Sequence, residues 1–158
     1  MAKKRQKYSV GSIVAIPLPT GQFAYAKVYN DMNMAIYKLL TFRISDVELI
    51  KHSSIAFYQA ATDSAIKNGE WPVIGEDPFP DEGSACPPPK AYGVVVEAGI
   101  GLDSPKIIEK GQIRSATLEE IKGMEIDTFC QRPELLIDKI MMRLVEGKPP
   151  KNIVPVNL

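Results

Sequence analysis

The chain has 158 residues, of which 45% are hydrophobic and 24% charged, a composition typical of one globular domain rather than of a disordered protein. Its 19 basic and 19 acidic residues cancel, so the chain lacks the overall basic excess of nucleic-acid-binding domains. No apolar run approaches the roughly 20 residues needed to cross a bilayer, and no signal-peptide stretch follows the basic N-terminus. We therefore expect a cytoplasmic protein with no membrane partner.

The first half of the chain has the pattern of a β-sheet. Residues 1–9 are basic and polar, and we expect a flexible segment there, followed by one domain over residues 10–158. A β-branched run ends at Pro17, a glycine turn follows, and the next segment alternates with period two. The sequence predicts strands over residues 13–16, 23–29, 34–42, 46–50 and 54–60. For residues 34–42 a helix is the alternative, because Ala, Met and Leu favour it.

The middle of the chain is expected to be irregular and the end helical. One helical turn is expected over residues 63–68, and the proline-rich residues 71–90 predict an extended loop. Further strands are expected over residues 92–97, 106–109 and 112–115. A capping box at Thr117 predicts a helix to about Met124, and helical spacing predicts another over residues 133–146.

Strands that precede helices indicate an α+β fold. We expect N-terminal and central antiparallel strands in a strongly twisted or barrel-like β-sheet, followed by short C-terminal helices. Both an open sheet and a closed barrel are compatible with the pattern.

The sequence offers little material for catalysis or metal binding. It contains one histidine, His52, and two cysteines, Cys86 and Cys130, which lack the short spacings of a zinc site. Free thiols are expected for the cysteines, with a single disulfide as the alternative. No catalytic, nucleotide-binding or metal-binding motif is present, so we expect neither an enzyme nor a cofactor.

An acidic stretch follows the basic first third of the chain. Residues 61–86 carry six acidic residues against Lys67 alone. An acidic patch could bind a basic partner and steer its approach. The candidate partner-binding residues are Glu70, Trp71, Glu76, Asp77, Asp81 and Glu82. The alternatives are a solvated loop for the carboxylates and a core position for Trp71.

A nucleic-acid-binding or regulatory β module is a second hypothesis. The basic first third is interleaved with aromatic residues on which bases could stack, namely Tyr8, Phe23, Tyr25, Tyr29 and Tyr37. Because the same residues are equally suited to a hydrophobic core, and the chain is not basic overall, nucleic acid is not the expected partner. An uncharacterised enzyme is a third hypothesis.

The ordered set of motifs resembles the bacterial immunity protein 26 family. The opening Val10–Leu18 and Thr20–Val28 is similar to the start of that family, although its members more often carry a small residue where Lys27 stands. Further similarity lies in Gly69–Gly75, Pro87–Pro89, Thr117–Glu125, Pro133–Glu134 and the stretch from Arg143 to Gly147. The resemblance implies an antidote in a polymorphic toxin system, which neutralises a cognate toxin domain by stoichiometric protein–protein binding. It carries over no catalytic residue.

Overall fold

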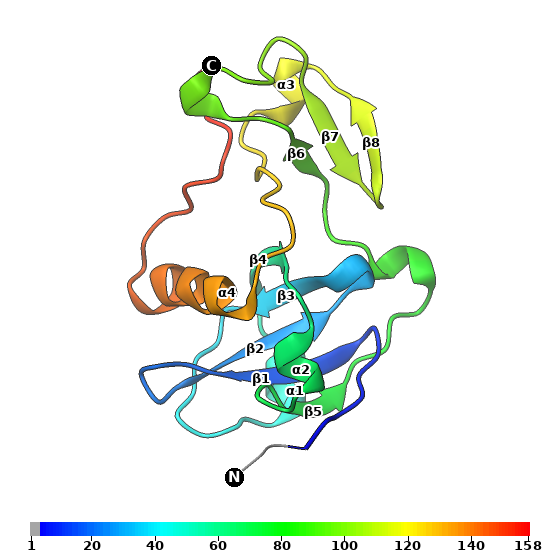
Figure 1. The fold of residues 1–158 in the computed structure, drawn as a ribbon, viewed down its shortest axis with the longest axis vertical. Helices are drawn as coiled ribbons and strands as arrows, with labels where there is room; N and C mark the ends of the chain where they lie inside the picture. Colours follow the sequence, from blue (N-terminus) through cyan, green and yellow to red (C-terminus); the bar gives the residue numbers. More distant parts are fainter. Residues whose placement is uncertain (1–3) are drawn as a thin grey trace.

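The computed structural model describes residues 4–158, and it confirms the predicted α+β class. Two antiparallel sheets lie one above the other, joined by extended segments of chain (Figure 1). Residues 1–3 of the predicted flexible segment lie outside the described residues. Within residues 4–158, the helices lack the combined length and apolarity that crossing a bilayer would require.

The larger sheet has the strand order β4-β3-β2-β1-β5, and every neighbouring pair is antiparallel. Its strands are β1 (Ser12–Pro17), β2 (Phe23–Val28), β3 (Asn33–Tyr37), β4 (Ile55–Ala60) and β5 (Val73–Glu76). Because β4 and β5 are both edge strands, the sheet is open and does not close into a barrel.

The smaller sheet has the strand order β6-β7-β8 and lies later in the chain. Its strands are β6 (Lys90–Tyr92), β7 (Lys106–Glu109) and β8 (Gln112–Ser115). The helices are α1 (Val47–Lys51), α2 (Ser64–Lys67), α3 (Leu118–Ile121) and α4 (Pro133–Ile140), the last continuing as a π-helical turn, η4 (Met141–Val145). Three short 3-10 turns complete the elements: η1 (Asn30–Met32), η2 (Glu82–Ala85) and η3 (Val96–Ala98).

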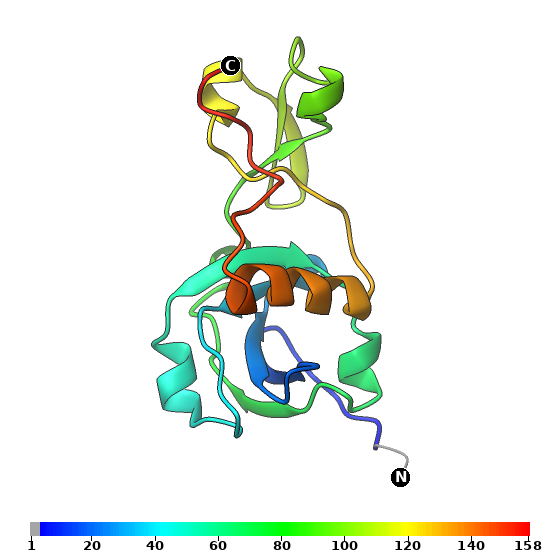
Figure 2. The ribbon, with the colours of Figure 1, turned by 90° about the vertical axis from the view of Figure 1, so that its left-hand side faces the viewer.

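Both faces of the larger sheet are buried. Alternate residues of a strand point to opposite faces, so Val14 and Ile16 enter one hydrophobic cluster while Ile13 and Ala15 enter another. Helix α4 lies across the first face and contributes Leu136 and Ile140, whereas α1 contributes Ile50 to the second (Figure 2). Double burial explains why β1 reads as a continuous apolar run.

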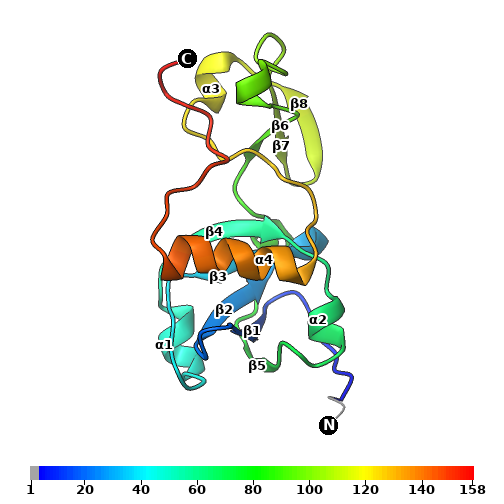
Figure 3. The same cartoon turned by 60° about the vertical axis from the view of Figure 1, so that its left-hand side comes forward.

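The smaller sheet has a core of its own on one face. Ala91 and Ile107 point into a cluster that also contains Ile121 and, from the end of the chain, Val154. Residues 152–154 return from α4 and hydrogen-bond to residues 123–126, so the chain crosses between the sheets more than once (Figure 3). The expectation of one domain over residues 10–158 stays a prediction.

Most of the predicted elements are present. The structure confirms the strands predicted at 13–16, 23–29, 54–60, 106–109 and 112–115, and the helices predicted near 64, 118 and 133. The hydroxyl of Thr117 accepts from the Glu120 amide at 3.2 Å, while the Glu120 side chain accepts from the Thr117 amide, which completes the capping box.

Three predictions of strand position were wrong. Residues 46–50 were expected to form a strand but belong to α1, because Asp46 Oδ1 caps the helix by accepting from the Glu48 amide at 3.0 Å. The strand predicted over 92–97 ends at Tyr92, since Gly93 with φ 68° breaks it. The strand predicted over 34–42 ends at Tyr37.

A fourth difference concerns the proline-rich residues 71–90. They were expected to be loop throughout, yet they contain β5, which pairs with β1 at the sheet edge. Pro72 precedes this strand, and an edge position tolerates a neighbouring proline.

The described part of the N-terminal segment is hydrogen-bonded to α2 and to the residues that lead into β5. The Gln6 side-chain amide donates to the carbonyls of Ile66 at 2.8 Å and Trp71 at 2.6 Å. The Tyr8 hydroxyl donates to Asp63 Oδ2 at 2.6 Å, and this hydrogen bond lowers the pKa of the Asp63 carboxyl. Burial and the same carboxylate raise the pKa of Tyr8 to about 12.

Trp71 is 2% exposed and packs in the first hydrophobic cluster, so its truncation should leave a large cavity. We expect Trp71→Ala to lower the free energy of unfolding by about 3–5 kcal/mol in urea titrations followed by circular dichroism. Phe42, which is 73% exposed, provides the control, and Phe42→Ala should change stability by less than about 0.5 kcal/mol. Equal effects of the two substitutions would contradict the core role of Trp71.

Tyr8→Phe should destabilise the protein by about 1 kcal/mol at pH 7, because it removes a partly exposed hydrogen bond to a charged group. The folded pKa of Asp63 is depressed, so this stabilisation is present above the carboxyl's usual 3.8 and disappears as pH falls further. The folded pKa of Tyr8 is raised, so the stabilisation is full below 10.0 and is lost as pH rises towards 12.

Unfolding of both proteins between pH 2 and pH 11 measures this difference. The control is Tyr92→Phe, since the Tyr92 hydroxyl makes no hydrogen bond to any residue in 4–158. A Tyr8→Phe deficit that stays constant down to pH 2 would refute the coupling to Asp63.

Candidate functional site

An ion pair between a buried lysine and a half-buried aspartate fixes the acidic segment to the larger sheet. Lys27, on β2, is 8% exposed, and its Nζ lies 3.0 Å from Asp77 Oδ2 and 3.9 Å from the centre of the Phe79 ring. The Phe79 ring also packs edge-on against Tyr29, with ring centres 4.8 Å apart. The Asp77 carboxylate is thus paired with Lys27. The contacts among Lys27, Asp77 and Phe79, here called the latch, hold the residues that follow Asp77 in place.

The other predicted partner-binding residues separate into distinct environments. Trp71 lies in the core, as the alternative interpretation had it, and cannot present its ring to a partner in this fold. Glu70 precedes β5 and Glu76 ends it, so five residues of mostly extended chain lie between them, which separates the two carboxylates by up to about 20 Å. The structure therefore does not bring Glu70 together with the remaining carboxylates.

Asp81 and Glu82 border a surface depression, here called the acidic hollow, which also includes Asn30 and Phe79. Both carboxylates are exposed, and Asp81 Oδ1 caps η2 by accepting from the Ser84 amide at 2.9 Å. Among residues 4–158, those that line the hollow include no cationic side chain. Glu76 is also exposed.

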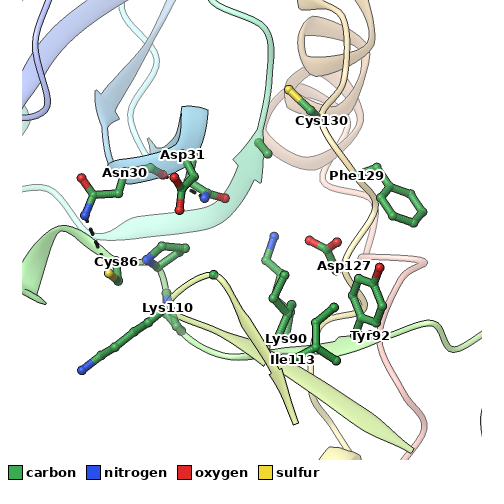
Figure 4. Close-up of a pocket in the computed structure, with 16 residues that line it drawn as sticks. Asn30, Asp31, Cys86, Lys90, Tyr92, Lys110, Ile113, Asp127, Phe129 and Cys130 are labelled. Carbon is green, nitrogen blue, oxygen red and sulfur yellow. Dashed lines mark hydrogen bonds between the residues drawn. The ribbon is translucent and has the colours of Figure 1, made fainter.

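A second cavity of about 500 Å³, here called the inter-sheet cleft, lies between the two sheets (Figure 4). It adjoins the acidic hollow, because Asn30 lines both and donates to the Glu82 carbonyl at 3.2 Å. One wall is the face of the smaller sheet that points away from its own core. Register places Lys90, Ile108 and Ile113 side by side on that face.

Strained backbone gathers at this cleft. Residues 4–158 contain four non-glycine residues with positive φ, and three of them, Asp31, Lys110 and Phe129, line the cleft, while the fourth, Met32, adjoins Asp31. A side chain in this region costs about 1–2 kcal/mol. Such residues cluster at functional sites, where the surrounding structure enforces them.

Phe129 combines strain with exposure. Its φ is 43° and its side chain is 69% exposed, although its ring touches Tyr92 edge-on at 6.3 Å between centres. Gln59, which is 1% exposed on β4, enforces the conformation. The Gln59 amide nitrogen donates to the Phe129 carbonyl at 3.1 Å, and its oxygen accepts from Thr128 and Lys139, each at 2.9 Å.

The charges that line the cleft are mixed. Figure 4 shows Asp31 and Lys90 pointing into the space between the sheets, whereas Lys110 points away from it. Lys90 Nζ donates to the Tyr58 carbonyl at 2.8 Å, and burial lowers the pKa of this amine. In residues 4–158, neither Asp31 nor Asp127 forms an ion pair.

The cysteines and the histidine show no catalytic arrangement. Cys86 and Cys130 both line the cleft as free thiols. Burial raises the pKa of the Cys130 thiol, which keeps it protonated and weakly nucleophilic. His52 is exposed at the end of α1, and its Nδ1 lies 2.7 Å from the Glu48 carbonyl oxygen. Within residues 4–158, no three acidic, histidine or cysteine side chains are placed to share a metal ion.

The aromatic residues of the nucleic-acid hypothesis do not form a stacking surface. Tyr25 and Tyr37 are buried in the second hydrophobic cluster, and Phe23 packs against it. Burial raises the pKa of Tyr37 to about 12. Tyr8 and Tyr29 are engaged by Asp63 and by Phe79. The core interpretation of these residues therefore fits the structure.

Sequence reasoning missed the inter-sheet cleft. Its walls come from residues about 30, 90, 110 and 129, which no local pattern connects. The glycine at 111 after Lys110 was the available signal for a two-residue hairpin turn. Nothing in the local sequence marks Phe129 as exposed.

Comparison with known proteins gives one positive result. The family model described as Immunity protein 26 matches residues 9–90, which is more than half of the chain. This match covers the larger sheet and the acidic segment and ends at the first residue of β6, so the C-terminal motifs of the resemblance lie outside it. No curated protein and no solved structure matches the chain. The chain belongs to the Immunity protein 26 family.

Proposed function

We propose that this protein is a cytoplasmic bacterial antidote, which binds a cognate toxin domain in a stoichiometric complex and blocks its activity without catalysing a reaction. Family membership is the observation that carries the proposal. An inhibitor of this kind needs a rigid surface complementary to its target and no reactive group. The larger sheet, buried on both faces, supplies the rigid support.

The acidic surface suits a basic target. Glu76, Asp81 and Glu82 are exposed, and the latch of Lys27, Asp77 and Phe79 holds their segment in one position. Fixed charges lose little conformational entropy on binding, and a one-sign patch accelerates association with an oppositely charged partner. A toxin with a basic active cleft, as in a nuclease, is the target that fits best.

Co-expression with a candidate toxin domain encoded by a gene next to that of this protein tests the proposed function. We expect the two chains to co-purify in equal amounts and the cells to survive expression of the toxin. The control is the same toxin with an unrelated cytoplasmic protein in place of this chain. Survival in neither case, together with the absence of a complex, would refute the proposal.

Glu76→Lys combined with Asp81→Asn and Glu82→Lys should slow association with the toxin domain about tenfold or more at low salt. Asparagine is chosen at position 81 because it retains the cap of η2. The difference from wild type should narrow as salt is raised, because salt screens exposed charges. Stopped-flow measurements of the association rate between about 20 mM and about 500 mM salt test this, because the Debye length shortens over that range.

The matched control changes net charge equally, at exposed positions outside the acidic hollow: Glu97→Lys, Asp103→Asn and Glu134→Lys. Equal slowing by both sets would mean that overall charge matters and the hollow does not. Glu70→Lys, at the other end of β5, should have little effect.

A further inference from the structure

We infer that the inter-sheet cleft is where the partner is anchored, and that the fixed Phe129 ring packs against a protruding apolar segment of a basic toxin domain. This inference rests on the proposed function and names the surface and the kind of partner. The acidic hollow affects the rate at which the two proteins associate, whereas the cleft affects the rate at which the complex dissociates.

The first support is that Phe129 is costly to the free protein. An exposed aromatic ring gains little from burial, and a left-handed backbone conformation is unfavourable for phenylalanine. Glycine or asparagine would suit φ of 43° better. The ring therefore lowers the stability of the isolated chain, which suggests that its benefit arises in a complex.

The second support is that the conformation is enforced. The buried Gln59 amide uses its nitrogen on the carbonyls of Ala60 and Phe129, and its oxygen on Thr128 and Lys139. With all of these partners in place, residues 128–129 have little freedom. A preorganised aromatic residue is the usual form of an interface hot spot.

The third support is an apolar wall beside Phe129, whose ring packs against Tyr92 of that wall. Tyr92, Ile108 and Ile113 lie on the face of the smaller sheet that its core leaves uncovered, and Ile113 is 49% exposed. The cleft volume of about 500 Å³ lies in the range of pockets that bury a small ligand. It could take one or two apolar side chains at the tip of a loop.

The charged residues around the cleft indicate which kind of partner it binds. The cleft and the adjoining acidic hollow are lined by four carboxylates, Asp31, Asp81, Glu82 and Asp127, against two amines, Lys90 and Lys110. Lys90 is engaged by a carbonyl and Lys110 points away. The surface that surrounds the apolar wall therefore favours a basic partner, which would place cations beside Asp31, Asp81 and Glu82.

Phe129→Gly tests the inference through two opposite effects. We expect its melting temperature to rise by about 2–4 °C, because the strain is relieved. We expect its affinity for the neighbouring toxin domain to fall about 30-fold or more, through faster dissociation, because the anchor is lost. Phe129→Asn, which also accepts the left-handed conformation, should bind as weakly without adding backbone flexibility.

Phe42→Ala is the matched control, since Phe42 is equally exposed but does not line the cleft. It should leave affinity unchanged. Melting curves are recorded on the isolated chains, and binding is measured with the toxin domain immobilised on a sensor surface.

Three results would overturn the inference. Wild-type affinity in both Phe129 variants would show that the ring does not anchor the toxin. A marked fall in melting temperature in both would show that Phe129 is a structural residue. Dimers of the wild-type chain that Phe129→Gly converts to monomers, measured by sedimentation, would assign the cleft to a second copy.

The inference and the proposed function can fail separately. If the wild-type chain binds the toxin domain and protects cells, and the Phe129 variants do so equally well, only the cleft assignment is wrong. If the wild-type chain neither binds nor protects, the proposed function fails and the cleft has no toxin to hold.

Discussion

Burial of both faces of the larger sheet is the constraint on which the rest of the structure depends. A sheet with two apolar faces needs a cover on each, because exposed apolar area of that size is costly. Helix α1 comes from within the sheet's own sequence, but α4 comes from beyond the smaller sheet. The chain must therefore leave the larger sheet, build the smaller one, and return. The inter-sheet cleft lies between these passages.

Local sequence patterns predicted the secondary structure correctly wherever residues within one segment determine its conformation. The β-branched run of β1, the alternation of β2 and the capping box at Thr117 each specify an element through nearby residues. At residues 46–50 the cap residue Asp46 and the closing Lys51 were a helix signal that the strand prediction did not use. At β5, pairing with β1 determined the strand, and such pairing is not visible in residues 71–90 alone.

The candidate site was harder to foresee, because its features depend on distant contacts. The acidic residues were visible in the sequence. Only the fold shows that Asp77 forms an ion pair with Lys27 and that Glu70 lies apart from the other carboxylates. Phe129 is held by an amide from β4, seventy positions earlier in the chain. No periodicity or motif reports a contact of that kind. Trp71 was the reverse case, since its burial agrees with the general tendency of tryptophan.

Under the proposed function, the point at which the family match ends has a consequence for how antidotes of this family could diversify. The match stops at Lys90, so one wall of the cleft belongs to the shared part of the chain, and most of the facing wall, from Tyr92 to Cys130, follows it. A relative could retain the whole larger sheet and carry a different second wall. Recognition of a new toxin would then require the exchange of one contiguous stretch, inserted between a sheet that is already complete and the helix that covers it.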